Sequence, residues 1–197
     1  MNLPNKVTAL RFFITLGYFV VLALVIEGAC VSPECRQLSL DAALALFLLA
    51  AISDVLDGYL ARKYHEETNF GRVADPFVDK ILVCGSFILL LSFRELDGIL
   101  ASWMVVVIVS REFVIHSIRT LLESRNLQFG ATFWGKQKML LQCIAIVGSL
   151  LYIAHLSRFD WSLAVVRAIV WVTVVSTVVS GLVYLRDAMK LLRDEGL

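Results

Sequence analysis

The sequence predicts an all-α integral membrane protein with six transmembrane helices. Of its 197 residues, 59% are hydrophobic and only 18% are charged, whereas soluble domains contain roughly 45–50% apolar and about 25% charged residues. Apolar runs of helical length recur along the chain, without the alternation typical of barrel strands. The formal net charge of +1 offers no broad basic surface, so we expect no nucleic-acid partner.

The predicted helices differ in how much of a span is apolar. The first, Phe12–Ile26, reaches full length if it begins near Val7 and accepts Arg11 at the membrane interface. Three runs are apolar over only half a span and adjoin charged residues: Ala42–Ile52, Ile81–Phe93 and Ile99–Ser110. The last two, Met139–Leu156 and Ala168–Leu185, contain no Asp, Glu, Lys or Arg. We expect one domain over residues 1–197.

The distribution of positive charge predicts the orientation. With six spans, short turns near Val31–Leu38, Arg94–Asp97 and Ser157–Asp160 share one side. Of the 18 Lys and Arg residues, only four fall there: Arg36, Arg94, Arg158 and Arg167. The positive-inside rule then puts both termini and the charged half-spans in the cytoplasm. We expect a multi-pass protein of the inner cell membrane with its active site facing the cytoplasm.

The N-terminal segment and two cysteines need separate interpretation. Lys6 and Arg11 precede an apolar run without a signal-peptide cleavage site, so we expect an interfacial N-terminal segment that leads into a retained first helix. Cys30 and Cys35 share one outer turn and could be bridged or free.

Four carboxylates occupy two of the half-apolar spans. Asp54 and Asp57 are three residues apart, and Asp75 and Asp79 are four apart, so each pair shares one helix face. A lone carboxylate at membrane depth costs roughly 2.5–3.5 kcal/mol, and divalent cations remove that cost. Oxygen-only ligands favour Mg²⁺, Mn²⁺ or Ca²⁺, and four carboxylates can bridge two ions about 3.5–4 Å apart. The alternative is that these residues cap helix ends or pair with Arg62, Arg72 and Lys80.

Small residues surround this acidic cluster. Gly58, Ala61 and Gly71 lie at helical spacing from the carboxylates, which lets helices approach closely and also leaves room for a flat base and ribose. Arg62 can bind a phosphate through two hydrogen bonds.

The stretch from Asp54 to Arg62, followed after eight residues by Gly71 to Asp79, resembles the signature of the CDP-alcohol phosphotransferase family at all eight signature positions. The resemblance implies six transmembrane helices, a homodimer, two Mg²⁺ or Mn²⁺ ions, and displacement of CMP from a CDP-linked substrate by an alcohol. It implies that Asp54, Asp57 and Asp75 are the main metal ligands, with Asp79 completing the site as candidate general base. The nucleotide pocket would be lined by Asp57, Gly58, Ala61, Arg62, Gly71 and Asp75.

The N-terminal stretch from Pro4 to Arg11 is similar to the P-N-x-x-T-x-x-R stretch of bacterial phosphatidylglycerophosphate synthases, a branch of this family. In that case Asn5 and Thr8 would approach the cytidine. The alternative is an interfacial helix start, with Asn5 as its cap and Arg11 reaching up to lipid headgroups.

Four cations further along the chain, Arg111, Arg119, Lys136 and Lys138, also resemble that branch. Arg111 and Arg119 lie about 80° apart around a helix, so they can face one cavity. Such a set suits a doubly charged acceptor phosphate. The alternative is an ordinary cytoplasmic flank that touches lipid phosphates. The sequence departs from the family at Met139, where a small hydroxyl residue is common.

These expectations combine into one reaction. The chain is expected to transfer the phosphatidyl group of CDP-diacylglycerol to sn-glycerol 3-phosphate, releasing CMP and forming phosphatidylglycerol phosphate. One alternative is another family activity: cardiolipin, phosphatidylserine or phosphatidylinositol phosphate synthesis. A divalent-cation transporter using the same carboxylates is the non-enzyme alternative.

Overall fold

The computed structural model describes the backbone of residues 3–64, 69–125 and 133–194 and the side chains of residues 9–53, 77–125 and 137–193. These ranges contain helices and short connections and no strand, as predicted. The six α-helices are α1 (Leu3–Ile26), α2 (Pro33–Tyr64), α3 (Asn69–Leu90), α4 (Ser102–Ser124), α5 (Phe133–Leu151) and α6 (Asp160–Asp194). A short 3-10 helix, η1 (Arg94–Leu96), precedes α4, and a π-helix, η2 (Tyr152–Leu156), follows α5.

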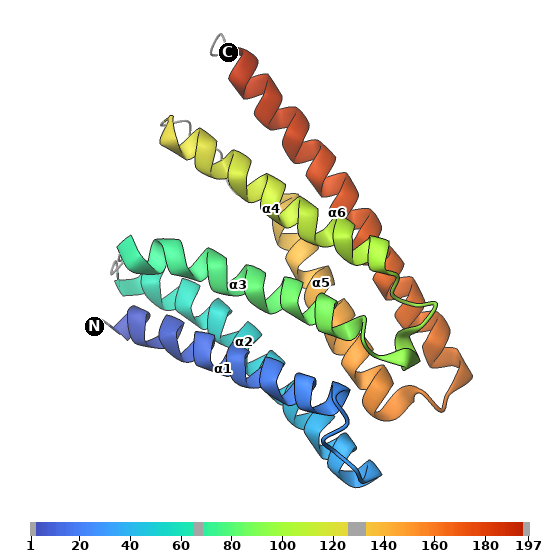
Figure 1. The fold of residues 1–197 in the computed structure, drawn as a ribbon. Helices are drawn as coiled ribbons and strands as arrows, with labels where there is room; N and C mark the ends of the chain where they lie inside the picture. Colours follow the sequence, from blue (N-terminus) through green and yellow to red (C-terminus); the bar gives the residue numbers. More distant parts are fainter. Residues whose placement is uncertain (1–2, 65–68, 126–132, 195–197) are drawn as a thin grey trace.

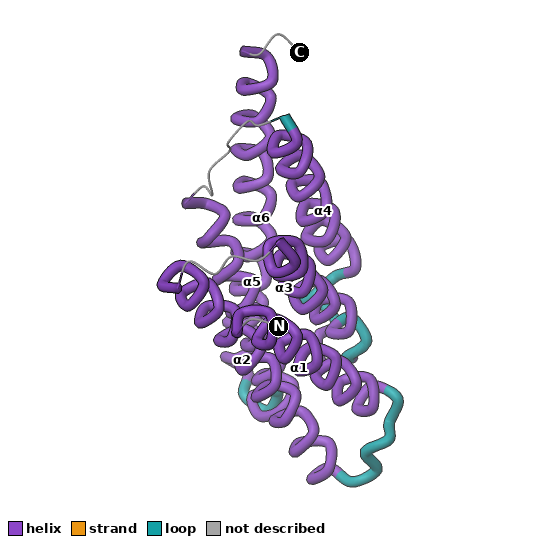
Figure 2. Tube along the Cα trace, turned by 90° about the vertical axis from the view of Figure 1, so that its left-hand side faces the viewer, coloured by secondary structure: helices purple, strands orange, loops and turns teal. Residues whose placement is uncertain are grey.

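Consecutive helices run in opposite directions (Figure 1). The start of α1 and the ends of α2, α4 and α6 therefore lie at one end of the molecule, which we call the terminal end. The connections over residues 27–32, 91–101 and 152–159 lie at the other, the turn end. Helix α1 packs against α2 and α3, whereas α6 packs against α4 and α5. Helix α3 lies between these groups and contacts α1, α4 and α5 (Figure 2).

Local sequence explains the turn between α1 and α2. Gly28 has a φ of +74°, a conformation that glycine adopts without strain, and the N–H of Ala29 donates to the carbonyl of Leu24 at 3.0 Å. This is the usual glycine ending of a helix. Ser32 caps the next helix, since its Oγ accepts from the N–H of Cys35 at 3.1 Å and a proline follows it.

A close approach fixes α1 against α3. A Cβ atom built on Gly85 would lie 2.4 Å from Cζ of Phe19, so the aromatic ring occupies the space of a missing side chain. Around this contact, one buried apolar cluster draws residues from all six helices, among them Tyr18, Phe47 and Phe87. The bundle therefore shares one core.

The outward surface is apolar along four helical stretches. Among the described residues, Ala9–Ile26, Pro33–Ser53, Gln137–Leu156 and Asp160–Arg193 are long and apolar enough to cross a membrane. Only 22% to 39% of each stretch is buried inside the molecule, so most of its apolar surface needs lipid as its solvent. Helices α3 and α4 do not reach this criterion, since both carry charged residues in one half. Six spans and the orientation of the termini therefore stay predictions.

The N-terminal residues form part of the first helix. Helix α1 begins at Leu3 and continues unbroken to Ile26, so the expected interfacial segment is its first turns and Asn5 lies inside the helix, past the capping position. The alternative that the Arg11 side chain reaches up to lipid headgroups is wrong. This side chain is fully buried, because it faces α3 and carries an ion pair there.

Two partly exposed polar bridges hold the turn end together. Nη2 of Arg36 on α2 donates to Oε1 of Glu95 on η1 at 2.5 Å, and these side chains are 37% and 32% exposed. Nε2 of His155 on η2 lies 2.6 Å from Oδ1 of Asp41, and its Nδ1 lies 3.0 Å from Nε2 of Gln37. Helix α2 is thereby tied to both neighbouring connections.

The cysteines are free thiols in the structure. Sγ of Cys30 lies 3.2 Å from Oγ of Ser39 on α2, and Cys35 is exposed near the start of the same helix.

Candidate active site

The predicted acidic cluster falls on the terminal half of α2 and α3. The helical backbone includes Asp54 and Asp57 on α2, and Asp75 and Asp79 on α3. Because both helices run unbroken through these positions, each pair shares one helix face. The side chains of several predicted site residues lie outside the described part of the chain: Asn5, Thr8, Asp54, Asp57, Gly58, Ala61, Arg62, Gly71, Asp75 and Lys136.

Asp79 is the described carboxylate of this cluster, and it is paired with Arg11 of α1. Nη1 of Arg11 donates to Oδ1 of Asp79 at 2.8 Å. The Arg11 side chain is 0% exposed and that of Asp79 is 25% exposed. A charge-assisted hydrogen bond in such a buried setting fixes the carboxylate in orientation. Arg11 thus joins the candidate site.

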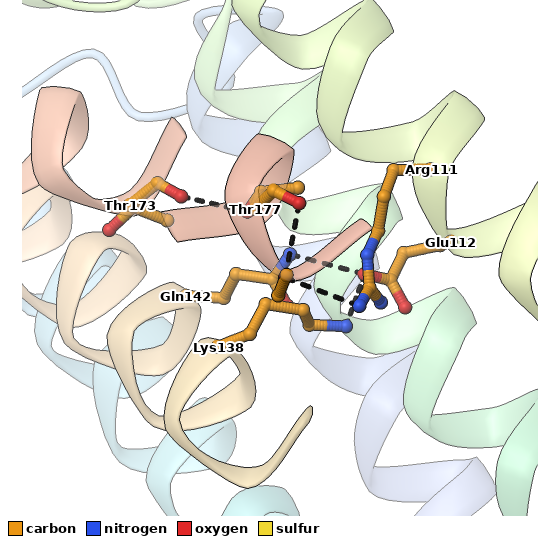
Figure 3. A network of polar contacts seen from close by, with 7 residues as sticks. Arg111, Glu112, Lys138, Gln142, Thr173 and Thr177 are labelled. Atoms are coloured by element: carbon orange, nitrogen blue, oxygen red, sulfur yellow. Dashed lines mark hydrogen bonds and ion pairs between the residues drawn. The ribbon is translucent and has the colours of Figure 1, made fainter. Parts of the chain in front are cut away.

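A second polar cluster joins α4 and α5. A single carboxylate oxygen, Oε1 of Glu112, accepts from Nζ of Lys138 in a short hydrogen bond and from Nε2 of Gln142 at 3.3 Å. It also lies 3.4 Å from Nη1 of Arg111. The side chains of Arg111, Glu112 and Lys138 are only 8% to 12% exposed. Figure 3 shows these side chains converging from the two helices.

Helix α6 supports the arginine of this cluster. Nη2 of Arg111 donates to Oγ of Ser180 at 3.3 Å. A Cβ atom on the adjacent Gly181 would lie 3.1 Å from Cγ of Arg111, so the glycine makes room for the stem of the arginine along α6. The guanidinium is thereby held between α4 and α6.

The four predicted acceptor-binding cations are only partly brought together. Arg111 and Lys138 meet at Glu112. Arg119 lies two turns along α4, with its guanidinium carbon 6.0 Å from the centre of the Tyr184 ring. Its buried Nε has no hydrogen-bond partner within the described ranges. In the part of the chain that the structure describes, Arg119 therefore makes no hydrogen bond to the cluster around Glu112 and lies beside it on α4.

Two side chains of α3 interact electrostatically with the α4–α5 cluster, and one of them also interacts with Asp79. Lys80, directly after Asp79, interacts electrostatically with Glu112 and Arg119 as well as with Asp79. One turn further, Cys84 interacts electrostatically with Glu112 and Lys138. Among the described residues, Lys80 therefore interacts both with Asp79 on its own helix and with the cluster that joins α4 and α5.

Sequence reasoning placed Arg11 at the membrane interface instead of in the site, and it assigned no site role to Glu112 or Gln142. A charged residue inside an apolar run indicates a functional position by default, and that signal was present for Arg11. Gln142 lies one turn after Lys138, so it shares the face of the lysine. The partner of each of these side chains lies on another helix or depends on one, so it could not be predicted before the packing of the helices was known.

The described residues fit a divalent-cation site in part. Three or more His, Cys, Asp or Glu side chains do not gather within the described ranges. The observation that bears on the fit is the unbroken helical backbone of α2 and α3, which keeps the two aspartate pairs at one-face spacing. The donor set predicted from the sequence is oxygen-only, as Mg²⁺ and Mn²⁺ prefer.

Comparison with known proteins gives consistent results. A family model described as CDP-alcohol phosphatidyltransferase matches residues 1–179. A protein of Bacillus subtilis (strain 168) is 36% identical over 185 residues, covering 93% of each chain, and is named CDP-diacylglycerol–glycerol-3-phosphate 3-phosphatidyltransferase. Proteins of the same name from Rickettsia bellii (strain RML369-C) and Mycoplasma pneumoniae (strain ATCC 29342) are 32% and 35% identical. The Rickettsia alignment covers 96% of both chains, and the Mycoplasma alignment covers 75% of this chain and 67% of the relative.

Proposed function

Because the chain belongs to the CDP-alcohol phosphatidyltransferase family, we propose that it transfers the phosphatidyl group of CDP-diacylglycerol to sn-glycerol 3-phosphate. The products are phosphatidylglycerol phosphate and CMP. The chain is thus a transferase of phospholipid biosynthesis. The relatives that bear the name of this reaction align with most of its length.

The observation that supports the acceptor best is the pairing of Arg111 and Lys138. These cations are distant in sequence, yet α4 and α5 bring them to one carboxylate oxygen in a nearly buried position. Burying cations is costly, and a phosphate offers them a strong partner. Arg119 and Lys136 extend this set in the proposal.

The membrane arrangement of the proposal has six spans. Both termini face the cytoplasm of a cell with this protein in its inner membrane, and so does the active site. The support is the common end at which α1 begins and α6 ends, together with the excess of Lys and Arg predicted for that side. The shared core of the six helices supports a single domain over residues 1–197. A homodimer is proposed from family resemblance.

Two Mg²⁺ or Mn²⁺ ions, when bound by Asp54, Asp57, Asp75 and Asp79, would neutralise the pyrophosphate and stabilise CMP as it leaves. The residues of the chain do the positioning. The cytidine is contacted from α1 by Asn5 and Thr8. On α2 and α3 the nucleotide is contacted by Asp57, Gly58, Ala61, Arg62, Gly71 and Asp75. The diacylglycerol chains of the donor stay in the lipid.

The transfer itself is an in-line displacement. The cationic set of Arg111, Arg119, Lys136 and Lys138 holds the acceptor phosphate, which directs the primary hydroxyl of the acceptor toward the donor. Asp79, fixed in orientation by Arg11, accepts the hydroxyl proton. The acceptor oxygen then bonds to the phosphorus that carries diacylglycerol, and the bond from that phosphorus to the bridging oxygen of CMP breaks.

An acceptor screen tests this proposal. Purified protein in detergent is given labelled CDP-diacylglycerol, Mg²⁺ or Mn²⁺, and one acceptor at a time: sn-glycerol 3-phosphate, inositol phosphate, serine or phosphatidylglycerol. We expect labelled phosphatidylglycerol phosphate only with the first acceptor, and no product after chelation of the metal. Product with a different acceptor would reassign the branch of the family. Cation flux into sealed vesicles without any lipid product would favour the transporter alternative.

A further inference from the structure

The arrangement of donors around Glu112 does not follow from stability alone. Three buried charged side chains meet there, and replacing such a group by apolar residues is often neutral or stabilising. Adjacent residues on a helix do not normally face one another, yet the Arg111 side chain turns so that Nη1 approaches Oε1 of its neighbour. The cluster therefore holds its cations in an arrangement that helix geometry alone would not produce.

Glu112 has the position of a hub. Its Oε1 engages Lys138 and Gln142, which lie one turn apart on α5, and Arg111 on its own helix. On the far side, Ser180 fixes the other terminal nitrogen of Arg111. An ammonium has three N–H donors and a guanidinium has five. Each cation therefore keeps donors beyond those that the hub uses.

We propose that Glu112 is a positioning residue for the acceptor phosphate: it holds Lys138 and Arg111 at a fixed separation so that their remaining donors meet that phosphate together. This inference rests on the proposed function, since it names how the acceptor site is built. It adds Glu112 and Gln142 to the site without making either a contact of the reacting atoms. The hub also offsets one positive charge when no acceptor is bound.

The kinetic test compares Glu112→Gln with the unmodified protein. The amide keeps the shape and loses the charge, so both cations lose their anchor. We expect the KM for sn-glycerol 3-phosphate to rise about tenfold, as for the loss of a charge-assisted hydrogen bond. The kcat and the KM for CDP-diacylglycerol should stay within about threefold, because Glu112 touches neither the donor nor the reacting atoms. The matched control is Glu123→Gln, an exposed carboxylate near the end of the same helix, which should change none of these values.

A double variant separates positioning from a general loss of structure. Because Glu112 acts partly through Lys138, Glu112→Gln should raise the acceptor KM by a smaller factor in the Lys138→Gln background than in the unmodified protein, and the remaining effect is the part that acts through Arg111. Independent, multiplying effects would contradict the proposal. An unchanged or lower acceptor KM in folded Glu112→Gln would also overturn it, the lower value indicating that Glu112 competes with the phosphate.

Glu112→Asp keeps the test decisive if the glutamine variant does not fold. The shorter side chain keeps the charge but cannot reach both cations, so the acceptor KM should rise at least about threefold with kcat preserved. No change would overturn the inference. If the unmodified protein itself does not use sn-glycerol 3-phosphate, both the proposed function and this inference fall. If it does and the variants are normal, only the inference falls.

Discussion

Both ends of the molecule carry ion pairs that join helices distant in sequence, but the two ends differ in exposure. At the turn end, the Arg36–Glu95 and His155–Asp41 side chains are between 32% and 42% exposed. Toward the terminal end, Arg11 is fully buried. The Arg111, Glu112 and Lys138 side chains are nearly so.

Water decides what each set of pairs can contribute. Exposed ion pairs contribute roughly 0–1 kcal/mol to the free energy of unfolding, so those at the turn end stabilise the contacts between connections only weakly. Burying charge carries a desolvation penalty of several kcal/mol per ion, which stability alone does not favour. The comparison therefore indicates that the buried pairs are maintained for chemistry, and four variants test this conclusion.

The largest effect is expected at the acidic cluster. Asp75→Ala removes one proposed metal ligand, so turnover should fall at least about 10³-fold, in line with the loss of the main electrostatic stabilisation of a transferred phosphoryl group. The fold should survive, since the variant also removes a costly charge from membrane depth. Lipid product formation and circular dichroism measure the two. Asp41→Ala at the turn end is the matched control and should stay active. Full activity of Asp75→Ala would end the assignment of the acidic cluster.

Arg11→Ala should have the next largest effect, because it leaves the partly exposed Asp79 without its guanidinium. We expect a loss of about 1–3 kcal/mol in the free energy of unfolding, less than for a fully buried pair, together with a large fall in turnover. Denaturation in detergent should show that saturating Mg²⁺ restores part of this stability, since a cation near Asp79 replaces the missing charge. Arg11→Lys, which keeps the charge, should lose less. An Arg11→Ala protein as stable and as active as the original would show that the Arg11–Asp79 ion pair contributes neither to stability nor to turnover.

Replacing Lys136 and Lys138 together by Ala should act mainly on the acceptor. The KM for sn-glycerol 3-phosphate is expected to rise about tenfold or more, with the KM for CDP-diacylglycerol nearly constant. Initial rates at varied acceptor concentration measure this. A variant with unchanged acceptor KM would show that the acceptor carries no phosphate, and would move the chain to a branch with a neutral alcohol.

The smallest effect is expected at the turn end. His155→Gln removes the contact with Asp41, and the free energy of unfolding should fall by no more than about 1 kcal/mol. Both KM values and kcat should be unchanged, because the site lies at the opposite end of the bundle. Thermal denaturation and standard turnover assays measure the outcome. A fall in turnover as large as that of Arg11→Ala would remove the distinction between the two ends.

Most of the helices could be predicted from apolar runs, because lipid demands backbone hydrogen bonds within each segment. Their lengths were underestimated where charge begins: the apolar run Ala42–Ile52 is the middle of α2, which extends from Pro33 to Tyr64. Charged residues were taken as boundaries, whereas in the bundle they continue the helix and meet partners on its neighbours. The π-helix at Tyr152–Leu156 left no signal in the apolar pattern.

The site was predictable as far as it depends on spacing along one helix. The Arg11–Asp79 pair joins residues 68 positions apart, so it depends on how α1 packs against α3. Similarly, Arg111 and Lys138 were expected to converge, but the carboxylate between them was not, since adjacent helix positions point in different directions. Such contacts depend on how helices pack against one another, and the spacing of residues along a single sequence does not reveal this packing.

The packing of α1 against α3 depends on Gly85, a residue with no side chain that could take part in the reaction. The Phe19 ring lies against the backbone of α3 at this point, eight residues along α1 from Arg11. This contact therefore sets how closely the axes of α1 and α3 approach. An added methyl group at Gly85 would collide with the Phe19 ring, so the end of that side chain would have to move to make room. Tolerance to substitution where α1 meets α3 is therefore governed by steric fit on the ångström scale rather than by polarity.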